Sequence, residues 1–159
     1  MTAVRLYRDD GPLAEWVGGK LGAGATRRDE ARRLDWLVPP LLRLVEYGWL
    51  IGLTTVVDRD ALPVCFAFVG VLAFHHYDAA YRVRYRGSAP PGWVRLWGGG
   101  WDGRMLLASL LALAGVLGPA LLVGAVGLGL AWGAESVSTW VRGVNGDLPA
   151  PVDDGEVLE

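Results

Sequence analysis

The sequence predicts an all-α membrane protein, built as a bundle of about four transmembrane helices. Apolar residues make up 52% of the 159-residue chain. Most of them fall in long runs that are separated by short polar or proline-containing steps. Helical runs of this length match the hydrocarbon thickness of a bilayer. The chain also contains 23 Gly and 8 Trp, which membrane helices use for close packing and for anchoring at the interfaces.

The chain is expected to divide into three regions. Residues 1–35 mix charges of both signs with several glycines, which predicts a cytoplasmic arm. Within this arm, residues 12–21 form either part of a linker or an amphipathic helix on the lipid surface. Residues 36–142 form the transmembrane domain, and the acidic segment 143–159 is predicted to be a disordered tail.

The first two spans are predicted at about 37–57 and 61–81. Pro39 and Pro40 suit the first turn of the first helix, where the N–H that proline lacks would have no helical partner. The polar residues 58–60 form the turn between the two spans.

The third and fourth spans are predicted from the apolar stretch 105–141. A single straight helix of this length would measure about 55 Å, well beyond a hydrocarbon core of about 30 Å. We therefore expect two short spans, about 102–117 and 119–141, joined at Gly118-Pro119. The alternative is one kinked helix, which would move the C-terminus to the other side of the membrane.

The placement of basic residues predicts the topology. The arm 1–35 and the segment 82–104 are rich in Arg, whereas the turn 58–60 carries two acids and one Arg. The positive-inside rule then places the arm and the 82–104 segment in the cytoplasm. With four spans, the protein is a multi-pass protein of the cell membrane with a cytoplasmic N-terminus. The net charge of −2 gives no reason to expect a nucleic-acid partner.

Ionisable side chains at membrane depth are the best candidates for a functional site. Such groups are costly unless they face the bundle interior or a partner. His75, Asp78 and Arg82 share one helix face through their i, i+3, i+7 spacing. A polar pocket open to the cytoplasm is predicted from six residues: Arg43, Glu46, His75, Asp78, Asp102 and Glu135.

The pocket is predicted to bind an anionic headgroup. The arginines expected to contact its phosphate are Arg82, Arg84, Arg86 and Arg104. His75 and Asp78 would orient the headgroup, and they are the candidate catalytic residues if the chain carries out a reaction. The acidic and histidine side chains match no standard ligand spacing, so neither a metal nor another cofactor is expected.

Internal ion pairing is the alternative role for these charged side chains. In that case the helices would use them as structural contacts and no ligand would be needed. The expected pairs are Asp78 with Arg82, Glu46 with Arg43, and Glu135 with His75 or Arg142.

A glycine-rich segment precedes the third predicted span. Gly98-x-Gly100-x-x-Gly103 matches the spacing of a phosphate-binding loop, but no strand precedes it, which argues against a dinucleotide-binding fold. The free N–H groups at a helix start favour an anion. Asp102 is expected to cap this helix instead.

Two stretches carry a resemblance to a known family: Phe74-His75-His76-Tyr77-Asp78-Ala79-Ala80-Tyr81-Arg82 and Gly99-Gly100-Trp101-Asp102-Gly103-Arg104. Over roughly residues 6–142 the chain resembles an actinobacterial membrane domain of unknown function. Such domains are associated with CDP-alcohol phosphatidyltransferase and nucleotidyltransferase proteins, which implies a link to phospholipid or glycolipid synthesis. The phosphatidyltransferase signature, Asp-x-x-Asp-Gly-x-x-Ala-Arg followed by Gly-x-x-x-Asp-x-x-x-Asp, is absent. The chain is therefore not expected to be that enzyme alone.

The function predicted from these observations is that of an integral membrane accessory domain. At its cytoplasmic face it would bind either the anionic headgroup of a membrane lipid or a partner enzyme. One alternative is an enzyme that acts on a lipid-linked phosphate, with His75 or Asp78 as the base. Another is a small transporter or proton relay that uses Arg43, Glu46 and His75. Glycine-rich helix faces make a homo-oligomer compatible with all three functions.

Overall fold

The computed structural model describes residues 38–85, 91, 93–94 and 98–144. The arm predicted at 1–35 and nearly all of the predicted tail lie outside these residues. The described part is helical and contains no strand. Its elements are the helix α2 (Val38–Val57), the 3-10 turn η2 (Arg59–Ala61), and the helices α3 (Leu62–Tyr85), α5 (Gly100–Leu113) and α6 (Leu117–Val144).

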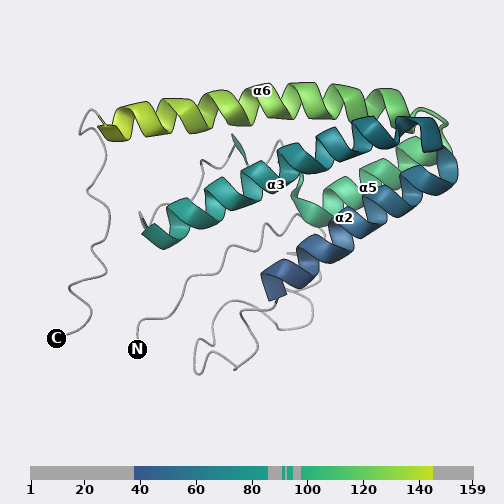
Figure 1. The fold of residues 1–159 in the computed structure, drawn as a ribbon, viewed down its shortest axis with the longest axis horizontal. Helices are drawn as coiled ribbons and strands as arrows, with labels where there is room; N and C mark the ends of the chain where they lie inside the picture. Colours follow the sequence, from purple (N-terminus) through teal and green to yellow (C-terminus); the bar gives the residue numbers. More distant parts are fainter. Residues whose placement is uncertain (1–37, 86–90, 92, 95–97, 145–159) are drawn as a thin grey trace.

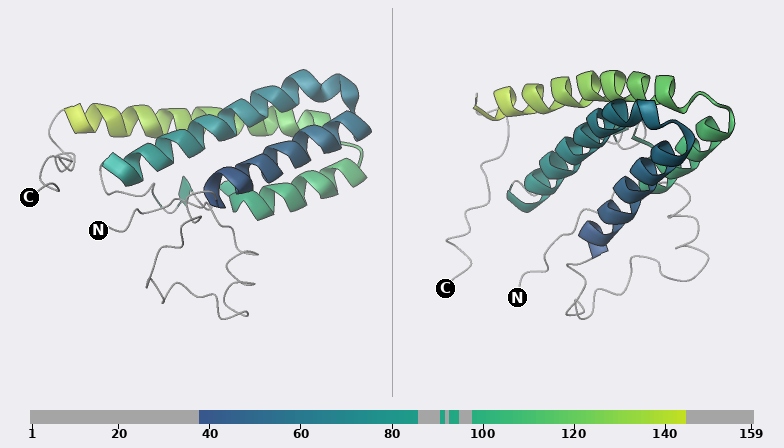
Figure 2. Two further views of the ribbon diagram at one scale, coloured as in Figure 1. Left: turned by 60° about the horizontal axis from the view of Figure 1, so that its bottom comes forward. Right: turned by 45° about the vertical axis from the view of Figure 1, so that its right-hand side comes forward.

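The helices form two antiparallel pairs that lie against each other (Figure 1). The pair α2–α3 is joined by η2, and the pair α5–α6 by residues 114–116. Both connections lie at one end of the bundle, here called the turn end (Figure 2). The other end, called the terminal end, is where α2 begins and where α3 and α6 finish. Across the pairs, α3 packs mainly on α6, and α2 mainly on α5.

The long apolar stretch divides into two helices, as predicted, but the break lies three residues before the predicted Gly118-Pro119 step. The N–H of Gly115 donates to the carbonyl of Ala112, and that of Val116 to the carbonyl of Leu111. Gly115 has a positive φ of 71°. This is a Schellman termination, which needs glycine in the left-handed conformation. Pro119 lies in the first turn of α6, where proline is tolerated.

Three of the four described helices are long and apolar enough to cross a membrane. The candidate spans are Pro40–Val57, Arg59–Val83 and Leu117–Arg142. The remaining helix, α5, has 14 residues, which corresponds to about 21 Å. The helix at the third predicted span, 102–117, is therefore too short to count among the candidate spans, because the chain has already turned at Gly115. Three of the four predicted spans are matched by helices of sufficient length.

An apolar core fills the bundle between the helices. Its members are Leu50, Cys65, Phe68, Leu72, Val94, Ala108, Leu117, Leu121, Ala125 and Trp132. Many large apolar side chains instead face outward, among them Leu44, Val56 and Leu130. In water such a surface would be an aggregation liability, whereas in a bilayer lipid tails cover it.

Glycines of α6 allow close contact with α3 at particular positions, which gives a first prediction. A Cβ atom at Gly124 would lie 2.9 Å from Cε2 of the buried Phe68 ring. Gly124→Ala should lower the free energy of unfolding by about 1–2 kcal/mol, because overpacking outweighs the better helix propensity of alanine. The measurement is unfolding in detergent micelles.

Gly127 provides the matched control on the same helix. A Cβ atom there would meet no heavy atom within 4 Å among the described residues. Gly127→Ala should therefore leave the stability unchanged or raise it by up to about 1 kcal/mol. Equal responses of the two variants would contradict the packing that the structure shows between α3 and α6.

Candidate functional site

Two polar clusters lie between the helices of the bundle. The Arg104 cluster joins α2, α3 and α5 and consists of Arg43, Glu46, Tyr47, His76 and Arg104. The Arg82 cluster joins α3 and α6 and consists of Asp78, Arg82, Glu135, Ser136, Thr139 and Trp140.

Glu46 is the anionic centre of the Arg104 cluster. Its side chain is fully buried, with an exposed fraction of 0%. Oε1 accepts a hydrogen bond from Nε of Arg104 at 2.6 Å, and Oε2 accepts one from Nη1 of Arg43 at 3.1 Å. One carboxylate of α2 therefore compensates two guanidinium groups, one from its own helix and one from α5.

The other contacts of Arg104 fix a turn and a histidine. Nη1 donates to the carbonyl oxygen of Gly98 at 2.8 Å, and Nη2 lies 3.4 Å from Nε2 of His76. Because a guanidinium can only donate, Nε2 of His76 must act as the acceptor in this contact. The proton of the neutral ring then lies on Nδ1, which donates to the hydroxyl oxygen of Tyr47 at 2.8 Å.

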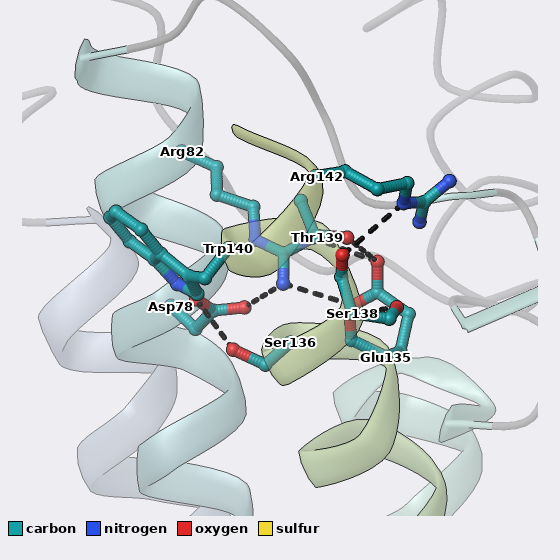
Figure 3. Close-up of polar contacts among 8 residues, drawn as sticks. All are labelled: Asp78, Arg82, Glu135, Ser136, Ser138, Thr139, Trp140 and Arg142. Atoms are coloured by element: carbon teal, nitrogen blue, oxygen red, sulfur yellow. Dashed lines mark hydrogen bonds and ion pairs between the residues drawn. The ribbon is translucent and has the colours of Figure 1, made fainter. Parts of the chain in front are cut away.

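Arg82 is held between two carboxylates in the second cluster (Figure 3). Nη2 lies 2.6 Å from Oδ2 of Asp78, four residues earlier on α3. Across the helix interface, Nη1 and Nη2 donate to Oε1 and Oε2 of Glu135 at 2.8 and 3.0 Å. Such two-point pairing of arginine with a carboxylate fixes both distance and orientation, so it sets how α3 and α6 meet.

Side chains of α6 complete the Arg82 cluster. Oδ1 of Asp78 accepts hydrogen bonds from Oγ of Ser136 at 3.1 Å and from Nε1 of Trp140 at 3.4 Å. Oγ1 of Thr139 donates to Oε1 of Glu135 at 2.8 Å. All four carboxylate oxygens are thus hydrogen-bonded or ion-paired, as buried charges require.

His75 lies beside these clusters in an aromatic contact. Its ring is 4% exposed and stacks on the indole of Trp132 with centroids 4.1 Å apart. Asp102 is the third residue of α5, whose N-cap is Gly99. The expectation that Asp102 takes the N-cap position is therefore wrong, because the helix begins two residues earlier.

A family model matches residues 8–157, and its description is a family of unknown function, DUF5941. The chain belongs to this family. No curated protein and no solved structure matches it significantly. The predicted resemblance to a domain of unknown function is thereby confirmed. The description of the DUF5941 family assigns no activity to its members.

The described contacts of this DUF5941 chain assign the six residues of the predicted pocket to different groups. Asp78 and Glu135 meet in the Arg82 cluster, whereas Arg43 and Glu46 meet in the Arg104 cluster. His75 contacts Trp132, and Asp102 lies in the first turn of α5. Two of the expected ion pairs are confirmed: Asp78 with Arg82, and Glu46 with Arg43. Glu135 pairs with Arg82 instead of the expected His75 or Arg142.

The four arginines predicted to bind a headgroup fall into two groups in this DUF5941 chain. Arg82 and Arg104 are buried, with exposed fractions of 3% and 6%, and both are ion-paired within the bundle. Arg84 is in the last turn of α3, and its side chain lies outside the described residues. Arg86 lies wholly outside them.

Several participants in the clusters were not predicted as site residues. Tyr47 and His76 carry no sequence signal beyond their positions next to Glu46 and His75. The hydroxyl of Ser136 donates to Asp78 across the interface between α6 and α3, so it helps to hold the two helices together. Trp140 follows Ser136 by four residues and so shares its helix face, which is a signal that could have linked the two.

Proposed function

We propose that this DUF5941 chain is an integral membrane accessory domain that binds anionic phospholipid headgroups at its terminal end. It would lie in the cell membrane with that end in the cytoplasm and serve phospholipid or glycolipid synthesis. The supporting observation is the asymmetry of charge along the bundle. In the half that includes the terminal end, five arginines of the described residues (Arg43, Arg82, Arg84, Arg104 and Arg142) exceed four acids (Glu46, Asp78, Asp102 and Glu135) by one charge, whereas at the turn end Asp58 and Asp60 exceed Arg59 by one.

The buried arginines have a structural role in this proposal. Arg82 and Arg104 connect helices through Glu135 and Glu46, so they position the terminal end without touching bulk lipid. Headgroup binding is assigned instead to Arg84 and Arg86, which follow Arg82 in the sequence, and to the exposed Arg142 in the last turn of α6. Basic side chains at this level are attracted by the anionic lipids of a cytoplasmic leaflet.

The alternative functions have less support. A catalytic base must reach its substrate, but both oxygens of Asp78 are engaged and His75 is stacked on Trp132. A proton relay would need polar groups to continue from Glu46 toward the turn end. Among the described residues, that region of the core is mainly apolar and includes Leu50 and Phe68.

The proposal predicts a loss of lipid preference when Arg84 and Arg86 are neutralised. In nanodiscs that contain phosphatidylglycerol and phosphatidylcholine, Arg84→Gln/Arg86→Gln should lower the relative affinity for phosphatidylglycerol roughly thirtyfold, because each of the two basic residues contributes about 1 kcal/mol near an anionic surface. Native mass spectrometry of the retained lipids measures this ratio.

Arg59→Gln at the turn end is the matched control, since it removes one positive charge from the opposite end of the bundle. Its lipid ratio should equal that of the unmodified protein. Equal ratios for the control and the double variant would refute headgroup binding at the terminal end. The purified chain also excludes a partner enzyme as the cause of a positive result.

A further inference from the structure

The chain that connects α3 to α5 turns back into the bundle. Trp93 and Val94 lie in this connection, and both are helical. Val94 is 1% exposed and belongs to the apolar core. The core members of α2, α3 and α6 nearest to the terminal end are Leu50, Leu72 and Trp132. Each of these lies roughly 18 Å from the terminal end of its own helix, so a residue that packs into this core lies well inside the bundle.

Gly98, just before α5, lies at a similar depth. A Cβ atom built on Gly98 would be 3.1 Å from Cζ2 of Trp132. Side chains of a helix lean toward its N-terminus, which for α6 is at the turn end (Figure 1). Gly98 is therefore level with Trp132 or closer to the turn end. Its carbonyl oxygen accepts a hydrogen bond from Nη1 of Arg104 at 2.8 Å, which gives a polar backbone group at this depth the internal partner that it needs.

Trp93 points away from the core that receives Val94. Consecutive helical residues are rotated by about 100° about the helix axis, so the inward direction of Val94 carries Trp93 toward the outside. The side chain of Trp93 is 45% exposed. The connection leads directly into α5 at Gly100, so Trp93 belongs to the side of the bundle where α5 is too short to form a full span. An outward apolar side chain at this depth of a membrane domain meets lipid.

We propose that Trp93 contacts the membrane interface and anchors the connection between α3 and α5 in the leaflet at the terminal end. An indole suits that layer, because its ring is apolar and its N–H can bind an ester or headgroup oxygen. On the side formed by α3 and α6, Trp140 lies about 12 Å closer to the terminal end than Trp132. The interface is therefore lower beside the start of α5 than beside α6. The proposal rests on the membrane embedding in the proposed function and does not depend on headgroup binding.

A spin label at position 93 tests the contact. Trp93→Cys is labelled with a nitroxide in phosphatidylcholine bilayers. Its collision rate with oxygen, which concentrates in lipid, is compared with that of a water-soluble nickel chelate. The collision rate with oxygen should be severalfold higher. Cys65, the single cysteine of the chain, is fully buried, so the unmodified protein reports the background labelling.

Two further labelled variants provide the reference values. Val126→Cys lies on the exposed face of α6 and reports a lipid environment, whereas Arg59→Cys lies at the polar turn end and reports water. The ratio of the two collision rates at position 93 should be closer to that of Val126→Cys. A ratio closer to that of Arg59→Cys overturns the proposal.

A second measurement covers the case in which the labelled variant fails to fold. Trp93→Phe keeps an aromatic side chain and removes one of the eight indoles. Intrinsic fluorescence is recorded in bilayers of phosphatidylcholine brominated near the carbonyl end of the acyl chains. The fraction of emission that the bromine quenches should fall in Trp93→Phe, whereas the fraction quenched by acrylamide from the water should not. An unchanged lipid-quenched fraction overturns the proposal.

The outcomes separate the anchor from the proposed function. If Trp93 contacts lipid while Arg84→Gln/Arg86→Gln keeps its preference for phosphatidylglycerol, the anchor stands and headgroup binding is wrong. If the label at position 93 reports water while the double variant loses its preference, the anchor is wrong and headgroup binding stands. If Val126→Cys also reports water, the chain is not embedded in the bilayer and both are wrong.

Discussion

Glu46→Gln is expected to lower the free energy of unfolding by about 3–5 kcal/mol, one of the two largest effects expected for single substitutions in this chain. The glutamine has nearly the same shape, but it removes the charge that Arg104 and Arg43 share at 2.6 and 3.1 Å. The buried guanidinium group of Arg104 and the partly buried one of Arg43 would then lack this counter-ion in a medium of low dielectric constant. Chemical or thermal unfolding in micelles measures the loss.

A second substitution tests the cause. Adding Arg104→Gln to Glu46→Gln should restore part of the stability, because the excess buried charge is reduced; two such sites are expected to be non-additive. Asp60→Asn, the same carboxylate-to-amide change at the exposed turn end, should have little effect. If the double variant lost as much stability as the two single variants combined, Glu46 and Arg104 would not interact as a charge pair. The losses would then come from altered packing alone.

Arg82→Gln is expected to lower the free energy of unfolding by a similar amount, about 3–5 kcal/mol. Asp78 and Glu135 both rely on the Arg82 guanidinium, at 2.6 and 2.8 Å. Without it, two carboxylates face each other between α3 and α6, and their repulsion adds to the cost of leaving them buried. The same unfolding measurement applies.

Lysine at position 82 separates charge from geometry. Arg82→Lys keeps the positive charge but cannot make the two-point contact with Glu135, so the loss should be smaller, roughly 1–3 kcal/mol. If Lys restored full stability, charge alone would explain the cluster. If Arg82→Gln were no worse than Arg82→Lys, the ion pair would contribute little to joining the helices.

The helices were largely predictable from the sequence because their signal is local. Apolar runs of membrane length predicted helices at 37–57 and 61–81, and the structure has α2 at Val38–Val57 and α3 at Leu62–Tyr85. The break between α5 and α6 was predicted but misplaced. Gly118-Pro119 combines two helix-breaking residues, yet proline fits a first helical turn. Gly115 provides the left-handed residue that ends α5.

The candidate site was predictable only where partners lie on one helix. Arg43 with Glu46, and Asp78 with Arg82, follow from spacings of three and four residues. The pairs Glu46–Arg104 and Arg82–Glu135 join different helices. These pairs depend on the rotation of each helix about its own axis and on its position along the bundle. Neither quantity can be read from the spacing of residues along the chain. For this reason Arg82 and Arg104 were expected at a headgroup and are found inside the bundle.

The short α5 gives the two sides of the bundle unequal heights. Its 14 residues span about 21 Å, whereas the 28 residues of α6 span about 42 Å. In a bilayer, acyl chains beside α5 would have to shorten, tilt or splay to meet this uneven contour, at a cost of fractions of a kcal/mol per Å of mismatch. The domain would thus thin the bilayer along one flank, and it would settle where the surrounding lipids tolerate such thinning most easily.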